Sequence, residues 1–186
     1  TKGGALVYIV PADVRMGTYV RGTNLEAILD ASEKVNRCLQ GCAYAIGAQV
    51  DIEEIPGYLP LIQNPGISSL FAANAESLLG EGTNLYGQEL MGATDAGDVS
   101  SVMPFIHIST GGYAGDAHSK NFTVCDPEMA YVMPAKAMAC TVIDLLWDGA
   151  ARAREVLADA RPKFTRESYL QFWDSFCSGT ADKNSF

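Results

Sequence analysis

Hydrophobic and polar positions along the first fifty-seven residues predict two strands, a helix and a third strand. Residues 5–10 (ALVYIV) and 13–22 (DVRMGTYVRG) are typical of strands joined by a tight turn, which predicts a hairpin. Residues 48–55 (AQVDIEEI) contain β-branched side chains and end at a Pro-Gly stop, which predicts another strand. The region therefore favours an antiparallel sheet with one helix covering a face.

The helix between these strands is predicted over residues 23–47. Thr23 and Glu26 have the spacing of a capping box, and Ser32 is the one polar interruption of the apolar face. That face carries Leu25, Ile28, Leu29, Val35, Leu39, Cys42 and Ile46. Cys38 and Cys42 are four residues apart and could bind a metal ion. We interpret both as core residues instead, because free cysteine is commonly buried.

Beyond Pro60 the pattern becomes mainly helical. Asn64 can cap a helix that starts near Pro65 and stops at Gly80, with an apolar face of Ile67, Leu70, Phe71, Asn74 and Leu78. Residues 102–110 (VMPFIHIST) predict a buried strand bracketed by turns.

The last third of the chain predicts three further helices. Asp126-Pro127 is typical of a cap and a first turn, and because a proline disrupts a helix interior, the main helix is placed at 134–147. Its core-facing stripe is Ala135, Met138, Ala139, Val142, Leu145 and Leu146. Residues 150–160 and 166–176 follow; the second bears Tyr169, Phe172, Trp173 and Phe176, whose spacing indicates a packing surface more than a cofactor site.

Charge and apolar content narrow the function classes. Thirteen Lys and Arg against 22 Asp and Glu give a formal net charge of -9. Such a chain repels nucleic-acid phosphates and anionic membrane surfaces, so no nucleic-acid partner is expected. The most apolar stretch, residues 129–147, is interrupted by Pro134, Lys136 and Asp144, which argues against a membrane span. The five cysteines include no C-x-x-C pair, which favours a reducing cytoplasm.

Five segments occur in an order that is more specific than any one of them: VPADVRMGTYVRG, IPGYLPL, TDAGDVSSVMPFIHI, GGYAGDAHSKNF and DPEMAYVMPAKAMACTVIDLL. Over residues 4 to about 150 they resemble the carboxy-terminal part of the dinuclear zinc amidohydrolases and metallopeptidases. That family includes aminoacylases, glutamate carboxypeptidases, auxin-conjugate hydrolases and aminobenzoyl-glutamate hydrolases.

The resemblance implies an α/β fold: an α+β lid followed by the C-terminal part of an α/β zinc-peptidase catalytic domain. Residues 1–57 would be a partial lid and dimerisation domain, and residues 58–186 would return to the catalytic domain and end in a helical tail. The family uses two divalent ions, zinc with manganese or cobalt as alternatives, to activate a water that attacks an N-acyl amino acid or a small peptide. Its glutamate general base lies in an N-terminal half that this chain lacks.

His118 is the metal ligand that the resemblance implies. It matches the family's last metal-binding histidine, and a neutral imidazole suits zinc. Gly111 and Gly112 precede it and would let the backbone approach substrate without side-chain interference. A surface or supporting role is the alternative that the residues alone leave open for His118.

Four further residues are candidates near such a site. His107, in an apolar strand, is expected to support the site from behind the ligands rather than bind metal. Asp95 and Asp98 could orient a ligand or cap the next segment. Arg21 matches a family arginine and suits a substrate carboxylate, with a surface ion pair as the alternative.

The fragment alone is expected to bind metal weakly and to be inactive, because one imidazole cannot hold two ions. Two other classes stay open. One is a non-catalytic ligand-binding or oligomerisation module, since sheet-plus-helix folds serve many roles. The other is an N-terminal nucleophile hydrolase that uses Thr1, although no other feature of the sequence supports this class.

Overall fold

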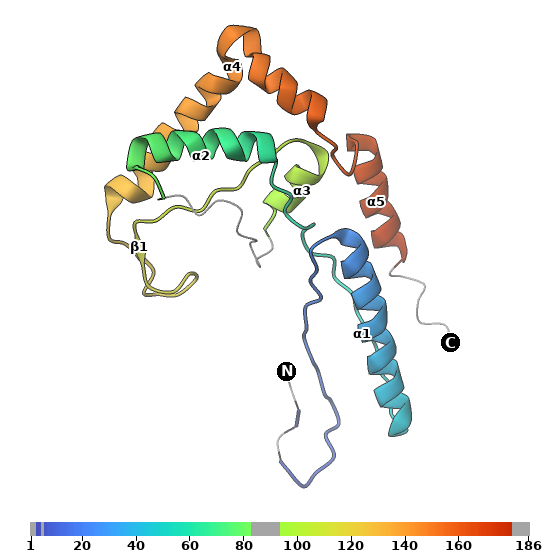
Figure 1. Cartoon of the computed structure of the whole chain (residues 1–186). Helices are drawn as coiled ribbons and strands as arrows, with labels where there is room; N and C mark the ends of the chain where they lie inside the picture. Colours follow the sequence, from blue (N-terminus) through green and yellow to red (C-terminus); the bar gives the residue numbers. More distant parts are fainter. Residues whose placement is uncertain (1–2, 5, 83–93, 180–186) are drawn as a thin grey trace. The chain divides into compact units, whose positions relative to one another are not determined.

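A computed structural model of the chain describes residues 3–4, 6–82 and 94–179, which leaves Thr1 outside it. The chain divides into two compact units, Thr1–Glu54 and Ile55–Phe186. Helices dominate the described residues (Figure 1): α1 (Leu25–Ala45), α2 (Pro65–Leu79), α3 (Ala96–Val102), α4 (Met133–Asp159) and α5 (Arg166–Gly179). Two short strands, β1 (Tyr113–Ala114) and β2 (Thr123–Val124), and a π turn, η1 (Glu128–Val132), complete the order.

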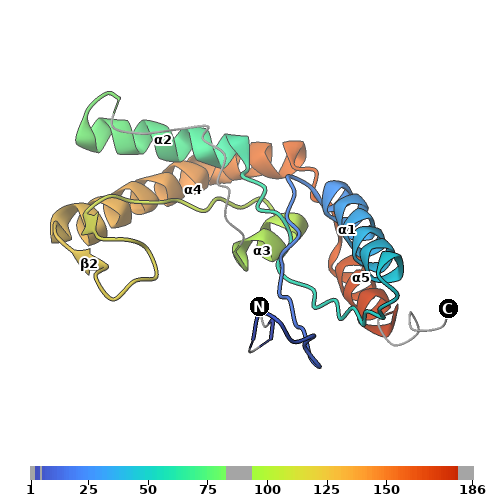
Figure 2. The same cartoon turned by 90° about the horizontal axis from the view of Figure 1, so that it is seen from below.

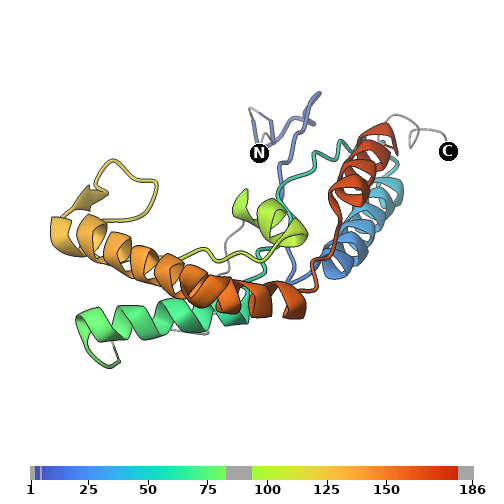
Figure 3. The ribbon, with the colours of Figure 1, turned by 90° about the horizontal axis from the view of Figure 1, so that it is seen from above.

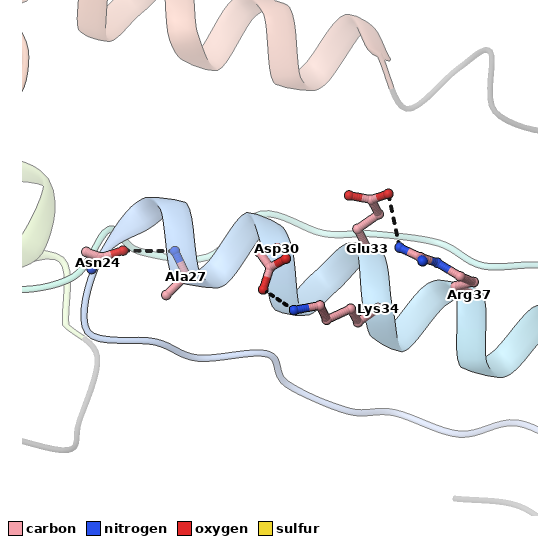
Figure 4. A network of polar contacts seen from close by, with 6 residues as sticks. All are labelled: Asn24, Ala27, Asp30, Glu33, Lys34 and Arg37. Carbon is pink, nitrogen blue, oxygen red and sulfur yellow. Dashed lines mark hydrogen bonds and ion pairs between the residues drawn. The ribbon is translucent and has the colours of Figure 1, made fainter.

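The first unit is built around α1, which confirms the predicted helix but not its predicted cap. Asn24, not Thr23, is the capping residue: its side-chain oxygen accepts a hydrogen bond of 2.8 Å from the backbone nitrogen of Ala27 (Figure 4). Asparagine is among the strongest capping residues, so the helix begins one residue later than the capping box suggests. Exposed ion pairs one turn apart, Asp30–Lys34 and Glu33–Arg37, add a few tenths of a kcal/mol each.

Glu54 fastens the extended segment 48–54 to α1. The Ser32 hydroxyl and the Asn36 side-chain amide both donate to Glu54 Oε1, the second over 2.9 Å. Ser32 is the one polar residue that interrupts the predicted apolar face of the helix. Its place is therefore explained by the carboxylate that it binds.

The predicted strands at 5–10, 13–22 and 48–55 are wrong for the residues that the structure describes, which are extended or irregular there apart from one bridge residue, Arg15. The alternating apolar side chains stay in solvent: Val7, Tyr8, Val10 and Tyr19 are each at least 80% exposed. A two-stranded hairpin is marginal unless another layer covers its apolar face. Nothing among the described residues of this unit does so, because they contain a single helix and no sheet.

The same lack of a covering layer corrects the interpretation of the α1 cysteines. Cys38 and Cys42 are both exposed rather than core, and α1 buries none of its residues. An amphipathic face is buried only where a second element packs on it.

In the second unit α2 runs beside α4, as two views agree (Figures 2 and 3), with Asn74 near Thr141 and Gly66 near Val156. The start and stop of α2 are confirmed. The Asn64 side chain accepts a hydrogen bond of 3.0 Å from the Ile67 nitrogen, Pro65 occupies the first turn, and Gly80 ends the helix with a φ of 96°. These signals are local, so the sequence alone sufficed to find them.

The face of α4 that meets α2 differs from the predicted stripe. Ala137 and Thr141 are buried, whereas Met138, Val142 and Leu146 are about half exposed or more. Ala75 is the buried residue of α2, so the buried positions of both helices carry small side chains.

A polar contact lies within this helix pair. The Asn74 side-chain nitrogen donates to Asp144 Oδ2 over 2.7 Å and to the Leu70 carbonyl over 3.0 Å. A partly buried carboxylate is stable there because it is hydrogen-bonded.

Pro134 and residues 147–150 mark the two irregular points of α4. The π turn η1 precedes Pro134, and this wider turn accommodates a residue that cannot donate a backbone hydrogen bond. At residues 147–150 the backbone leaves helical angles, and Asp148, Gly149 and Ala150 have positive φ. The ribbon of α4 bends along its length (Figure 1). The predicted helix end at Trp147 and restart near Ala150 are confirmed.

α3 and α5 complete this unit. Phe164 donates its backbone N–H to the Ser101 carbonyl over 3.0 Å, and the predicted aromatic residues of α5 pack on one another and on Phe164. Gly97 of α3 lies so close to the Leu59 carbonyl that a Cβ would overlap it. The predicted strand at 102–110 is wrong: α3 extends to Val102 and the rest is extended chain outside any ladder.

By length and composition alone, the stretch Glu128–Asp159 is apolar enough to cross a membrane. Core helices of soluble proteins share this property.

Candidate functional site

His118 lies in the turn of a small hairpin and is exposed. Its φ of 62° places it in the left-handed region, which non-glycine residues rarely adopt and which is common at functional sites. Ser119 donates to the Asp116 carbonyl over 3.1 Å across this turn. The imidazole is therefore presented to solvent by a constrained backbone.

The hairpin that carries His118 is braced at its base. β1 pairs antiparallel with β2, so that Tyr113 opposes Val124 and Ala114 opposes Thr123. The rings of Tyr113 and Phe122 stack with centroids 5.1 Å apart and an interplanar angle of 13°. Such ring pairs stabilise beyond the area they bury, which holds the two arms of the hairpin together.

Gly112 connects this hairpin to the start of η1. Its carbonyl accepts hydrogen bonds from the nitrogens of Cys125 and Asp126, over 2.9 and 3.1 Å. Its φ is 90°, and a Cβ there would meet the Asp126 carbonyl and the Ala130 nitrogen, both backbone atoms. Gly112 is thus required for backbone packing, a role that the substrate-approach interpretation did not anticipate.

Asp126 confirms its predicted capping role. Its side chain accepts from the Met129 nitrogen over 3.1 Å and its carbonyl accepts from Ala130 over 2.9 Å. The hairpin, Gly112 and this cap form one continuous backbone support under the loop of His118.

His107 lies in the extended segment that follows α3, and its backbone is bound by a side chain far away in sequence. Gln63 Nε2 donates to the His107 carbonyl over 2.7 Å, and the His107 nitrogen donates to Gln63 Oε1 over 2.8 Å. The contact between Gln63 and His107 could not be predicted from the sequence, because no local pattern links residues that are 44 positions apart.

Asp98 and Asp95 take different places at α3. Asp98 accepts a hydrogen bond of 3.0 Å from the Tyr169 hydroxyl and so ties α5 to α3. Burial first, and then this contact with the Asp98 carboxylate, raise the pKa of Tyr169. Asp95 stands at the start of α3 without a side-chain capping bond and accepts from the Thr94 hydroxyl over 2.9 Å.

Arg21 belongs to the first unit and is exposed. Its guanidinium lies over the Tyr19 ring, 5.6 Å from the centroid, which is a cation–π contact. The predicted role in binding a substrate carboxylate stays a prediction.

The described residues do not gather into a metal centre. Within residues 3–4, 6–82 and 94–179 no group of three or more His, Cys, Asp or Glu side chains could hold an ion. His118 supplies one ligand at most, whereas a catalytic zinc generally has about three protein ligands. A complete site would need donors from beyond these residues.

A cavity of about 530 Å³ lies elsewhere in the second unit, between the start of α2, residues 103–105 and the end of α4. Its charged residues are Arg152, Glu155, Asp159 and Arg161, and Arg152 pairs with Glu155 over 2.9 Å. Neither histidine lines it. The volume of this cavity does not by itself indicate a ligand or a reaction, so we place the candidate site at the hairpin.

Comparison with known proteins shows which class of enzyme the chain is similar to. The chain is 31% identical over 158 residues to a protein of Mus musculus named Xaa-Arg dipeptidase, a match that covers 78% of this chain and 36% of that relative. The Homo sapiens protein of the same name is 26% identical over 157 residues, which cover 78% and 35% of the two chains. No protein-family model matches, and no solved structure does.

These relatives support a peptidase, which confirms the coarse part of the resemblance. The chain spans about a third of the length of the curated relatives it matches. The dinuclear zinc centre and the subfamily stay predictions.

The two glycines before the hairpin should respond differently to substitution. Gly112→Ala forces a side chain into a left-handed conformation and against backbone atoms, so we expect a loss of about 3 kcal/mol in the free energy of unfolding. Gly111→Ala is the matched control, because its Cβ would meet only the flexible Met129 side chain, at 3.3 Å. Urea denaturation measures both. Equal effects would contradict the packing role of Gly112.

The Tyr169–Asp98 contact predicts a loss of stability at alkaline pH. Because the folded-state pKa of Tyr169 is raised above 10.0, its contribution is fully present below pH 10 and is lost as the pH rises through the folded value. Tyr169→Phe should cost about 1 kcal/mol of unfolding free energy at pH 8. Urea denaturation from pH 8 to 11 should show the difference from the parent shrinking above pH 10. A constant difference would refute the contact.

Proposed function

We propose that this chain is part of a metal-dependent peptidase that hydrolyses the amide bond of a dipeptide or an N-acyl amino acid. The observation that carries the proposal is the similarity to Xaa-Arg dipeptidase across 158 residues. The five ordered segments, from the one that contains Arg21 to the one that begins at Asp126, independently support it.

His118 is the residue of this chain that would contribute to a metal centre. The turn between β1 and β2 holds its imidazole in solvent, where other donors can reach the same ion. A bound divalent cation would supply Lewis-acid polarisation of a carbonyl and lower the pKa of a water. The described residues do not complete the donor set. We propose, as the family resemblance implies, that the general base and the remaining ligands belong to an N-terminal half of the protein.

The substrate proposed first is a dipeptide with a C-terminal arginine, after the name of the relatives. A net charge of -9 creates a field that attracts the guanidinium of such a substrate. Arg21, whose charge would oppose a cation, suits the C-terminal carboxylate instead, because its planar fork can bind both oxygens. N-acyl amino acids are the second substrate class, and the cytoplasm is the proposed location.

Activity should require the whole gene product and His118. We expect the full-length protein with added zinc, manganese or cobalt to release arginine from Ala-Arg, and the 186-residue chain to release none. His118→Ala in the full-length protein should lower kcat/KM at least about 100-fold, because a metal ligand is lost. Amino-acid analysis measures release, and metal analysis after dialysis measures occupancy.

The control for this experiment is Lys120→Ala, an exposed change in the same loop that should leave turnover intact. Full activity of His118→Ala would contradict the metal-ligand role. A full-length protein that hydrolyses no substrate of either class would favour a binding or oligomerisation module instead.

Association is the other part of the proposal. We propose that residues 1–57 mediate a homodimer, because α1 and the extended segments beside it leave apolar side chains such as Val10, Tyr44 and Ile46 exposed. Light scattering should give the mass of a dimer at high micromolar concentration, and Tyr44→Lys should shift it towards monomer. A monomer at that concentration would refute this.

A further inference from the structure

The carboxamide of Gln63 binds both backbone groups of a single residue, His107. Its nitrogen donates to the carbonyl and its oxygen accepts from the N–H, over 2.7 and 2.8 Å. Only one orientation of the amide allows this, because a flipped group would set donor against donor and acceptor against acceptor. The contact therefore fixes the side chain of Gln63 as well as the backbone of His107.

This pair of bonds reproduces one rung of an antiparallel ladder. In such a ladder two opposed residues exchange both N–H···O bonds, and here a side chain takes the place of the second strand. The neighbouring rung is ordinary backbone, since the Asn64 nitrogen donates to the Phe105 carbonyl over 2.8 Å. Residues 105 and 107 are thus held at two successive positions on the same edge of the segment.

Gln63 is itself held in place by the helices of this unit. Gln63 directly precedes Asn64, whose side chain caps α2, and α2 packs along α4. The carboxamide is therefore held at the first turn of a packed helix instead of on a free loop.

We propose that Gln63 is a positioning residue for His107. By fixing the N–H and the carbonyl of that residue it restricts both backbone dihedrals, and the backbone dihedrals decide which χ1 rotamers the imidazole can adopt. The importance of His107 beside a catalytic site rests on the proposed function. The positioning itself can be measured without any catalysis.

The test uses the 186-residue chain and three substitutions. Gln63→Met keeps the length of the side chain and removes both bonds. Gln63→Glu keeps the acceptor at neutral pH but cannot donate to the His107 carbonyl until its carboxyl is protonated, near pH 4.3. Gln171→Met is the matched control, because Gln171 is exposed and lies on α5 in the same unit.

Two NMR signals measure the effect on His107. One is the hydrogen-exchange rate of the His107 amide, and the other is the set of Hα–Hβ couplings of His107, which separate one χ1 rotamer from an average. The chain has only two histidines, so His118→Ala assigns the imidazole signals without ambiguity.

We expect Gln63→Met to speed exchange of the His107 amide about tenfold and to average its couplings, with the Gln171→Met chain unchanged. At pH 7 Gln63→Glu sets a carboxylate oxygen against the His107 carbonyl, and the repulsion between these two acceptors should displace the side chain, so that this variant behaves like Gln63→Met. It should approach the parent as the pH falls towards 4, each rate being compared with the parent at the same pH. A loss of general stability would not produce this recovery.

The proposal is overturned if Gln63→Met leaves both NMR signals as in the parent, or if Gln63→Glu shows no recovery at acidic pH. Absence of peptidase activity in the full-length protein would refute the proposed function. It would not alter the exchange rate or the couplings of His107, so the two proposals can fail separately.

Discussion

The close contact between α2 and α4 is the interaction on which the larger unit depends. The small residues Ala75 of α2 and Ala137 and Thr141 of α4 are buried in this unit, and the Asn74 side chain joins the two helices through Thr141 and Asp144. Two segments are placed by it. The start of α2 brings Gln63 to the backbone of His107, and the turn before α4 receives Gly112 and with it the hairpin of His118. Both histidines thus depend on one helix pair, through different ends.

Because α4 buries its small residues beside α2, its larger apolar side chains stay exposed. Packing Ala137 and Thr141 against α2 leaves Val142, Leu146 and Trp147 more than half exposed, although these are the larger apolar side chains. Burial of a large side chain stabilises by about 1.5–3 kcal/mol, so this arrangement forgoes stabilisation that the sequence could supply. A surface of this kind is typical of a protein region that meets further protein, which agrees with the proposal that an N-terminal half completes the catalytic domain.

Helices were predictable from the sequence because their signals are local. Asn64-Pro65 and Gly80 mark the ends of α2, and Asp126 and the irregular residues 147–150 mark the last long helix. The sheet was not predictable in the same way, because alternation such as that of residues 5–10 yields a strand only where a partner and a covering layer exist. For the candidate site, the loop position of His118 was found, whereas the packing role of Gly112 and the Tyr169–Asp98 contact depend on folding across distant segments.

The segment 103–109 shows why an apolar strand pattern can be present without a strand. Residues 105 and 107 direct their backbone groups towards Asn64 and Gln63, and in extended chain the residues between them direct theirs to the opposite edge. Within the described residues, the backbone groups of Ile106 and Ile108 make no hydrogen bond on that edge. One edge of the segment is thus bound by the backbone N–H of Asn64 and the side chain of Gln63. A β-ladder requires a continuous backbone as partner, and these two groups do not supply one. The pattern of hydrophobic residues records which side chains favour burial. The hydrogen-bond partner of each backbone group decides whether those residues form a strand, and here that partner is the carboxamide of Gln63.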